Sequence, residues 1–208
     1  IMSEVYVAGV SMTHFGKHLD RSLKDLAGEA LAGVLKDAGC DVKALEAVFF
    51  GNCVQGHMEG QDMVRGEIAL RSFGIESIPV VNVENACATA STAFHMAVNY
   101  VKAGAADIVL AIGVEKMFSE DKELMFSAFD GAWDVNDVEN VKNQLLQLGE
   151  GVEIPEGSTS PRPYSASLAP QNSQRPVPAS STMSSPPLVG STCRSRLRFL
   201  QVCSVRSN

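Results

Sequence analysis

The chain has 208 residues, 45% of them hydrophobic, and this is enough apolar material to build a sizeable core. Its 24 acidic residues outnumber its 17 lysines and arginines, which argues against nucleic acid as a partner. The five cysteines form no CxxC pair and no apolar run approaches the roughly 18 residues of a membrane span, so the sequence predicts no disulfide framework, no zinc site and no membrane span.

The first fifty residues alternate between strand and helix patterns. Residues 5–10 are predicted to form a first strand. Residues 23–38 have the i, i+3, i+4, i+7 spacing of one helical face, with Ser22 as N-cap and Gly39 as the stop. Residues 47–50 form a short apolar run, which predicts a buried parallel strand.

A polar loop, residues 51–60, follows this strand and carries Asn52, Cys53 and His57. The carboxyl end of a strand is where open α/β sheets place their ligand sites. An ordinary glycine-rich connection is the alternative, and the spacing assigns no role to Cys53 or His57. Residues 62–72 are then predicted to form a shorter helix.

Residues 79–104 organise the chain: an apolar strand, the turn Glu84-Asn85, Cys87, and a long helix that begins with small residues. A cysteine at the start of a helix lies where unpaired N–H groups and the helix dipole favour the thiolate. Cys87 is therefore a candidate nucleophile, and an inert buried thiol is the alternative. His95 lies about 12 Å further along the helix, too far to be its base.

Residues 107–112 complete a β-α-β-α-β-α-β order, which predicts an α/β fold with a parallel sheet and right-handed crossovers. The helix after Cys87 is apolar nearly all round, so we expect it to be buried between layers.

Four segments, in order and at matching spacing, resemble the thiolase family, specifically the branch of sterol carrier protein x and related lipid-transfer-type acyl-CoA thiolases. They are VYVAGVSMTHFG (5–16), EGQDMVRGEIALRSFGI (59–75), NACATASTAF (85–94) and VLAIGVEKM (109–117). The resemblance covers roughly residues 4–160. It implies the N-terminal half of a thiolase-like fold, with a mixed, mainly parallel sheet and helices on both faces.

We therefore expect three parts. Residues 1–117 form the thiolase-like N-terminal half. Residues 118–157, with a helical stretch near 135–148, form part of the loop domain that covers the acyl-CoA site in thiolases, or else a surface helical hairpin. Residues 158–208 form a tail.

The composition changes abruptly at this tail. Residues 1–156 hold all 24 acidic residues and 11 of the basic ones, for a net charge of −13, whereas the rest carries +6. The 51 residues of the tail include 13 serines and seven prolines, so we expect disorder. An altered reading frame, a splice variant or a gene-model error would explain the break, and a genuine Arg-rich interaction tail is the alternative.

The resemblance implies a two-step acyl transfer, in which Cys87 carries the acyl group and coenzyme A is the co-substrate, without a bound cofactor or metal. The acid/base histidine and second cysteine of thiolases come from a second half whose motifs are absent here, so we expect a truncated chain that is inactive alone. A non-catalytic acyl-CoA-binding or interaction module and an acyl-CoA aldolase-type relative are the alternatives. The expected partners are acyl-CoA and, once the fold is complete, a second copy of the chain. The expected location is the cytoplasm, or the peroxisome if the authentic C-terminus is missing.

Overall fold

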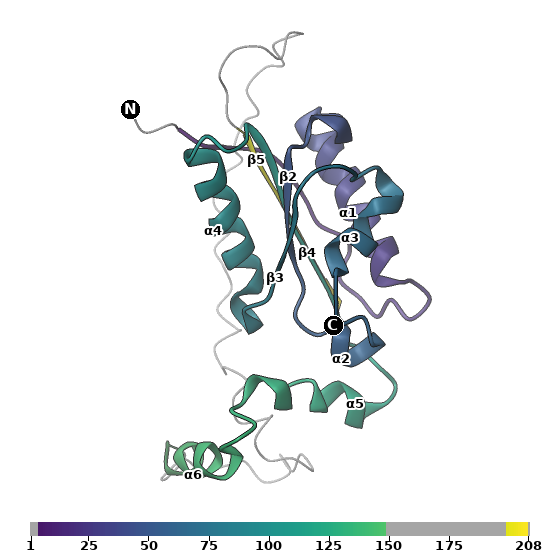
Figure 1. The fold of residues 1–208 in the computed structure, drawn as a ribbon. Helices are drawn as coiled ribbons and strands as arrows, with labels where there is room; N and C mark the ends of the chain where they lie inside the picture. Colours follow the sequence, from purple (N-terminus) through teal and green to yellow (C-terminus); the bar gives the residue numbers. More distant parts are fainter. Residues whose placement is uncertain (1–3, 149–198, 208) are drawn as a thin grey trace, which may run out of the picture. The chain divides into compact units, whose positions relative to one another are not determined.

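The computed structural model describes residues 4–148 and 199–207 of the chain (Figure 1). In chain order its elements are β1 (Tyr6–Ser11), α1 (Leu23–Ala38), η1 (Val42–Ala44), β2 (Ala47–Gly51), α2 (Gln55–Glu59), α3 (Arg65–Leu70), η2 (Arg71–Phe73), β3 (Val80–Val83), η3 (Ala86–Ala88), α4 (Thr89–Lys102), β4 (Ile108–Lys116), α5 (Lys122–Ser127), η4 (Asp130–Ala132), α6 (Val138–Leu148) and β5 (Phe199–Ser207).

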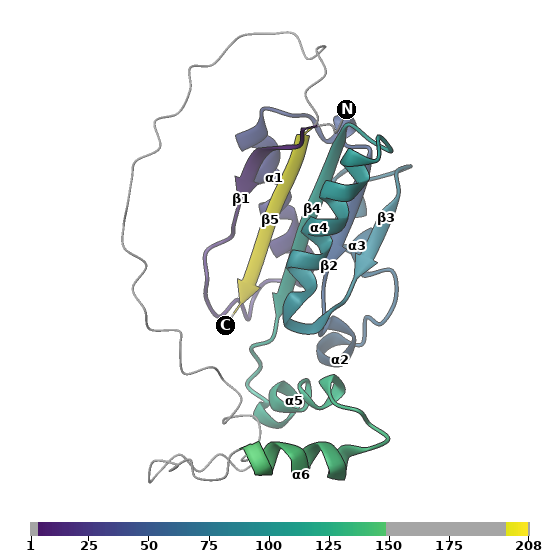
Figure 2. The ribbon, with the colours of Figure 1, turned by 90° about the vertical axis from the view of Figure 1, so that its left-hand side faces the viewer.

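The strands form one five-stranded sheet in the order β1-β5-β4-β2-β3, and every pair in it is parallel. Helix α4 covers one face, whereas α1 and α3 lie on the other (Figures 1 and 2). This three-layer α/β arrangement is the predicted fold class.

Alternation along β2 and β4 divides the core into two clusters, one on each face of the sheet. Val48 and Phe50 of β2 pack with α1 and α3. Ala47 and Phe49 point to the opposite face and pack with α4. All five residues of β2 are buried, as the continuous apolar run at this position predicts.

Helix α1 confirms the predicted boundaries. The side chain of Ser22 accepts a hydrogen bond from the Asp25 N–H, and Asp25 bonds back to the Ser22 N–H, which completes a capping box. Gly39 ends the helix in the left-handed conformation, with φ of 62°.

Three elements differ from the predicted ones. Helix α3 begins at Arg65 rather than at residue 62, because Val64 before it has φ of 47° and lies outside the helical region. The loop after β2 contains a short helix, α2, that the sequence did not predict. Strand β4 continues to Lys116, four residues beyond the predicted end.

The expectation of a disordered tail is wrong for Phe199–Ser207, which form strand β5 between β1 and β4. The sequence FLQVCSV is rich in residues that favour strands, and pairing on both sides satisfies its backbone N–H and C=O groups. Residues 158–198, to which the same expectation applied, lie outside the described residues.

The described residues fall into two compact units, 4–128 with β5, and 129–148. The second unit contains η4 and α6, and α6 corresponds to the helical stretch predicted near 135–148. No helix among the described residues is long and apolar enough to cross a membrane.

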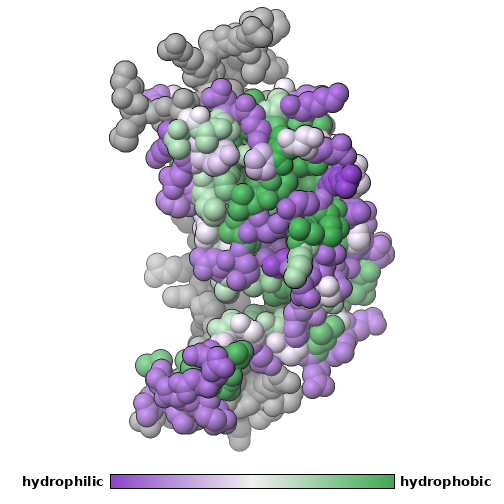
Figure 3. Space-filling model, viewed as in Figure 1, coloured by the Kyte–Doolittle hydropathy of each residue, from purple (hydrophilic) through white to green (hydrophobic). Residues whose placement is uncertain are grey.

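Among the described strands, β3 lies at one edge of the sheet and pairs with β2 alone. Its Val80 and Val81 are only partly buried. Figure 3 shows apolar surface in the middle of the molecular face that includes this edge.

Gly66 of α3 lies so close to β2 that a Cβ atom there would come within 2.6 Å of the Phe50 Cβ. We predict that Gly66→Ala lowers the free energy of unfolding by about 1–3 kcal/mol, because strand and helix must separate. Urea denaturation measures the change. The control is Gly16→Ala, whose Cβ would meet nothing nearer than 3.9 Å. Equal stability of the two variants would contradict the packing of α3 on β2.

Candidate active site

The carboxyl ends of β2, β3 and β4 meet at one edge of the sheet, because these strands are parallel and their registers match. Gly51 at the end of β2 pairs with Val83 of β3 and with Gly113 of β4. The polar residues that follow therefore converge at this edge, as in other open α/β sheets. They are Asn52 and Cys53 after β2, Glu84 after β3, and Glu115 near the end of β4.

Cys87 lies in η3, a single 3-10 turn between β3 and α4, and it is exposed to solvent. Ala86 before it has φ of 44°, a left-handed conformation that residues other than glycine rarely adopt. The predicted sharp turn from strand to helix is thus present, and it presents the thiol at the surface.

Hydrogen bonds fix this turn to the first turn of α4. The Asn85 N–H donates to Thr89 Oγ1 over 2.8 Å, and Asn85 Nδ2 donates to Thr92 Oγ1 over 2.9 Å. The Thr89 hydroxyl in turn donates to the Ala86 carbonyl over 2.7 Å. The small hydroxyl residues after Cys87 therefore hold the strained peptide in place.

Helix α4 buries one face only, through Thr89, Ala93, Ala97 and Val101. The expectation that it is buried between two layers does not hold within 4–148 and 199–207, because the sheet covers a single side. His95 lies on the exposed side, and its ring bonds to Asn99 over 2.9 Å.

Cys53 is a second thiol at the same edge of the sheet. Its Sγ donates to Glu84 Oε1 over 3.4 Å. Burial, the bond to Glu84 and the charge of Glu115 raise the pKa of the Cys53 thiol to about 12. Cys53 is thus a neutral hydrogen-bond donor at neutral pH rather than a nucleophile.

Glu115 holds the loop that carries Cys53. Its carboxylate accepts hydrogen bonds from the backbone N–H of Cys53 and, over 3.3 Å, from that of Val54. Burial raises the pKa of Glu115, although these two bonds and the nearby charge of Arg65 oppose the rise.

Arg65, the first residue of α3, fixes the same loop from the other side. Its Nη1 donates to the carbonyl and side-chain oxygens of Asn52 over 3.1 and 2.9 Å, and to the Cys53 carbonyl over 3.2 Å. The sequence patterns predict no role for Arg65 or Glu115. A charged residue that closes an otherwise apolar strand, as Glu115 does in VLAIGVEKM, was the available signal.

His57 is not brought to this network. It lies on α2, and its Nε2 bonds to the Ser127 hydroxyl over 2.9 Å. The described residues contain no cluster of three or more His, Cys, Asp or Glu side chains that could hold a metal ion.

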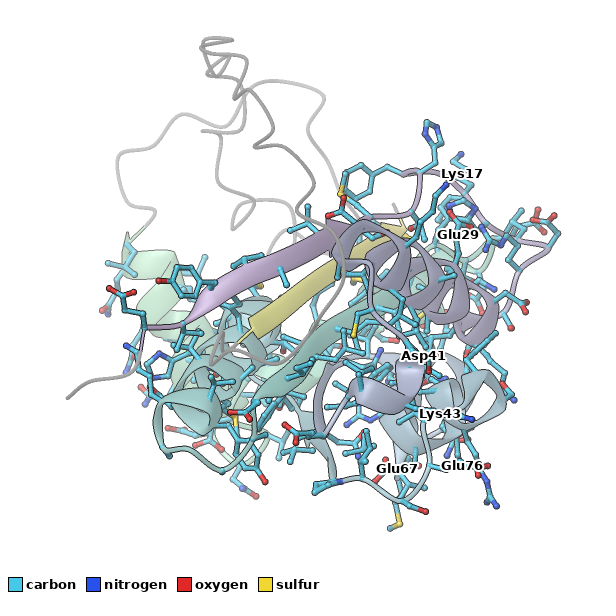
Figure 4. The ribbon with its side chains drawn as sticks, turned by 90° about the horizontal axis from the view of Figure 1, so that it is seen from above. Lys17, Glu29, Asp41, Lys43, Glu67 and Glu76 are labelled. Atoms are coloured by element: carbon cyan, nitrogen blue, oxygen red, sulfur yellow. The ribbon has the colours of Figure 1, made fainter. Side chains whose placement is uncertain are left out.

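An open pocket of about 400 Å³ is formed by residues that follow β1, β2 and β4. Its lining is Leu19, Met58, Glu59, Lys116, Phe118, Ser119, Glu120 and Leu124. The ammonium groups of Lys17 and Lys122 lie 4.5 and 4.3 Å from the centre of the Phe118 ring. The pocket thus combines apolar walls with nearby lysines, and the carboxylates of Glu59 and Glu120 also line it. Lys17 is labelled in Figure 4.

The raised pKa of Cys53 predicts an order of thiol reactivity. An ordinary cysteine has a pKa near 8.5, whereas a pKa of about 12 leaves only about one thiol in 10⁴ ionised at pH 8. We expect iodoacetamide to modify Cys53 of the folded protein at least about 100-fold more slowly than Cys53 of the urea-unfolded chain at pH 8, as measured by peptide mass mapping. The reactivity of Cys53 should still be rising above pH 10. A plateau for Cys53 below pH 9 would contradict the bond to Glu84.

The sequence matches the family described as thiolase, N-terminal domain, over residues 5–147. Acetyl-CoA acetyltransferase of Methanocaldococcus jannaschii is 36% identical over 135 residues, which are 64% of this chain and 34% of that protein. Sterol carrier protein 2 of Gallus gallus is 41% identical over 115 residues, 54% of this chain and 20% of that protein. Benzoylsuccinyl-CoA thiolase subunit BbsB of Thauera aromatica is 34% identical over 114 residues, 54% of this chain and 28% of that protein.

The match thus spans about a third or less of the length of these curated relatives. The family match covers most of this chain, including every strand from β1 to β4 and the turn that carries Cys87. The chain belongs to the thiolase family, and residues 5–147 correspond to the N-terminal domain of that family.

Proposed function

We propose that this protein takes part in thiolase-type acyl transfer on acyl-CoA thioesters, with Cys87 as the acyl carrier. The observation that carries the proposal is the position of Cys87, an exposed thiol on a strained turn immediately before a 14-residue helix. An exposed thiol at this place is accessible to a thioester substrate, as a cysteine that carries an acyl group must be.

The proposed chemistry has two steps. The Cys87 thiolate attacks the acyl carbonyl carbon, a C–S bond forms, and the bond to the leaving group breaks: the C–S bond of an acyl-CoA, or the Cα–Cβ bond of a 3-ketoacyl-CoA. In the second step the thiol of coenzyme A, or the α-carbon of another acyl-CoA, takes the acyl group and Cys87 is released. Coenzyme A is thus a co-substrate, and no resident cofactor takes part.

The names of the relatives support acyl-CoA as the substrate class, since two of them are an acetyl-CoA acetyltransferase and a benzoylsuccinyl-CoA thiolase subunit. The pocket beside Phe118 supports the same class. Its apolar walls suit an acyl or pantetheine chain, and phosphate groups suit Lys116 in its lining and Lys17 and Lys122 over the Phe118 ring.

This chemistry also needs an acid/base group at the thiol. Within the described residues no hydrogen bond joins Cys87 to a histidine, since His57 bonds to Ser127 and His95 to Asn99. The raised pKa of Cys53 disfavours it as a base near neutral pH. We infer that residues outside the described part of the complete enzyme supply proton transfer.

A homodimer of the completed fold is part of the proposal. The edge strand β3, which pairs with β2 alone among the described strands and has partly buried Val80 and Val81, supports it. The cytoplasmic location, and the peroxisome as its alternative, remain predictions.

We predict that the 208-residue chain alone cleaves acetoacetyl-CoA at a rate about 10²–10⁴-fold lower than the same chain joined to a thiolase-like second half. The physical reason is the missing acid/base group. With free coenzyme A present, loss of the absorbance of the acetoacetyl enolate measures the rate. Cys87→Ala should abolish the activity of the joined chain, whereas Cys40→Ala should retain it.

Equal rates for the joined chain and its Cys87→Ala variant would overturn Cys87 as the acyl carrier. Calorimetric binding of acyl-CoA without any Cys87-dependent turnover, even in the joined chain, would favour the non-catalytic binding module instead.

A further inference from the structure

We infer that Glu84 is a positioning residue for Cys87 and that the thiol of Cys53 holds Glu84 in place. This inference rests on the proposed function, because it explains how the nucleophile is presented. It gives a role to two side chains that the acyl-transfer chemistry itself does not use.

Glu84 stabilises the strained residue next to the nucleophile. Its Oε1 accepts a hydrogen bond from the Ala86 N–H over 2.6 Å. Ala86 has φ of 44°, and an L-residue keeps this conformation only where its surroundings impose it. The Ala86 N–H is also one of the donors that a helix start leaves unpaired, so the carboxylate satisfies it and fixes the peptide before Cys87.

The same oxygen of Glu84 accepts the hydrogen bond from Cys53 Sγ, over 3.4 Å. The pKa of the Cys53 thiol is raised to about 12, so the proton needed for this bond stays on sulfur at neutral pH. Glu84 is therefore held from two sides, by a backbone donor on its own turn and by a thiol from the end of β2.

Cys53 is itself immobilised by the sheet. Glu115 of β4 accepts from its N–H, and Arg65 of α3 donates to its carbonyl over 3.2 Å. A continuous series of contacts thus runs from β4 and α3, through Cys53 and Glu84, to the peptide that precedes Cys87. The bond from Ala86 to Glu84 is local, whereas the other contacts join segments that are distant in sequence.

The contribution of Glu84 is conformational rather than electrostatic. A carboxylate does not stabilise the negative charge of a neighbouring thiolate, so its charge alone would oppose the nucleophile. Its oxygen, however, is the acceptor that the turn requires. Glutamine offers the same oxygen without the charge, and alanine offers neither, so these two variants separate the two effects.

The test measures the rate of alkylation of Cys87 by iodoacetamide at neutral pH in the 208-residue chain, with Cys40 of the same molecule as internal reference. Glu84→Ala should lower the ratio of the Cys87 rate to the Cys40 rate by about 3- to 10-fold, because the thiol leaves the helix start. Glu84→Gln should keep the ratio within about twofold of the wild-type value.

Glu76→Ala is the matched control, because Glu76 is a glutamate that precedes β3, whereas Glu84 follows it. Glu76 is labelled in Figure 4. Its side chain is 64% exposed and pairs only loosely with Arg71, at 3.7 Å. Its Cys87 ratio should equal that of the wild type. Cys53→Ala, which leaves Glu84 intact but removes its thiol donor, should lower the ratio by about 2- to 3-fold and gives a second variant if Glu84→Ala fails to fold.

The outcomes separate the two proposals. A wild-type Cys87 that reacts no faster than Cys40 would overturn the activated nucleophile of the proposed function. A fast wild-type Cys87 whose ratio is unchanged in both Glu84→Ala and Cys53→Ala would overturn the positioning role alone. A ratio as low in Glu84→Gln as in Glu84→Ala would assign the effect to charge and overturn the conformational account.

Discussion

The matched parallel pairing of β2 with its two neighbours is the constraint on which the rest depends. All five residues of β2 are buried, and Phe49 and Phe50 anchor it to opposite helical layers. A slip of one residue would exchange these faces, so the register is fixed. Because β2, β3 and β4 end at the same edge, the segments that follow them meet there. Cys53 and Glu115, which are 62 positions apart in the sequence, are hydrogen-bonded at this edge, and Cys53 also bonds to Glu84 in the turn that carries Cys87.

This convergence places the charged side chains of Glu115 and Arg65 at the edge of the apolar core. Glu115 is largely buried, and a buried carboxylate is unfavourable unless its oxygens accept hydrogen bonds. The backbone N–H groups of Cys53 and Val54 provide them, while Arg65 binds the carbonyl side of the same loop. Hydrogen bonds to two charged side chains therefore join the loop after β2 to β4 and α3. The stability of this sheet edge and the geometry of the turn that carries Cys87 depend on one network, so substitutions in it should affect both.

Local patterns predicted what local interactions determine. The capping box at Ser22, the spacing of α1 and the turn from β3 to Cys87 could all be recognised from neighbouring residues. The network of Glu115, Arg65 and Cys53 could not, because its members are far apart in sequence and only the sheet register brings them together. Strand β5 was not predicted for a similar reason. The residues before it are mostly polar, and its pairing with β1 and β4 is set by long-range contacts. Helix α3 begins late because Val64 adopts a left-handed conformation, which the sequence does not favour.

The most direct test of the account is detection of an acyl group on Cys87 itself. The protein is incubated with acetoacetyl-CoA or acetyl-CoA, digested at acidic pH, and its peptides are analysed by mass spectrometry. The account predicts one acetyl group on the peptide that contains Cys87, its release by free coenzyme A, and its absence from the Cys87→Ala variant. An acetyl group found on Cys53, or on lysines with Cys87 unmodified, would contradict the claim that Cys87 is the acyl carrier.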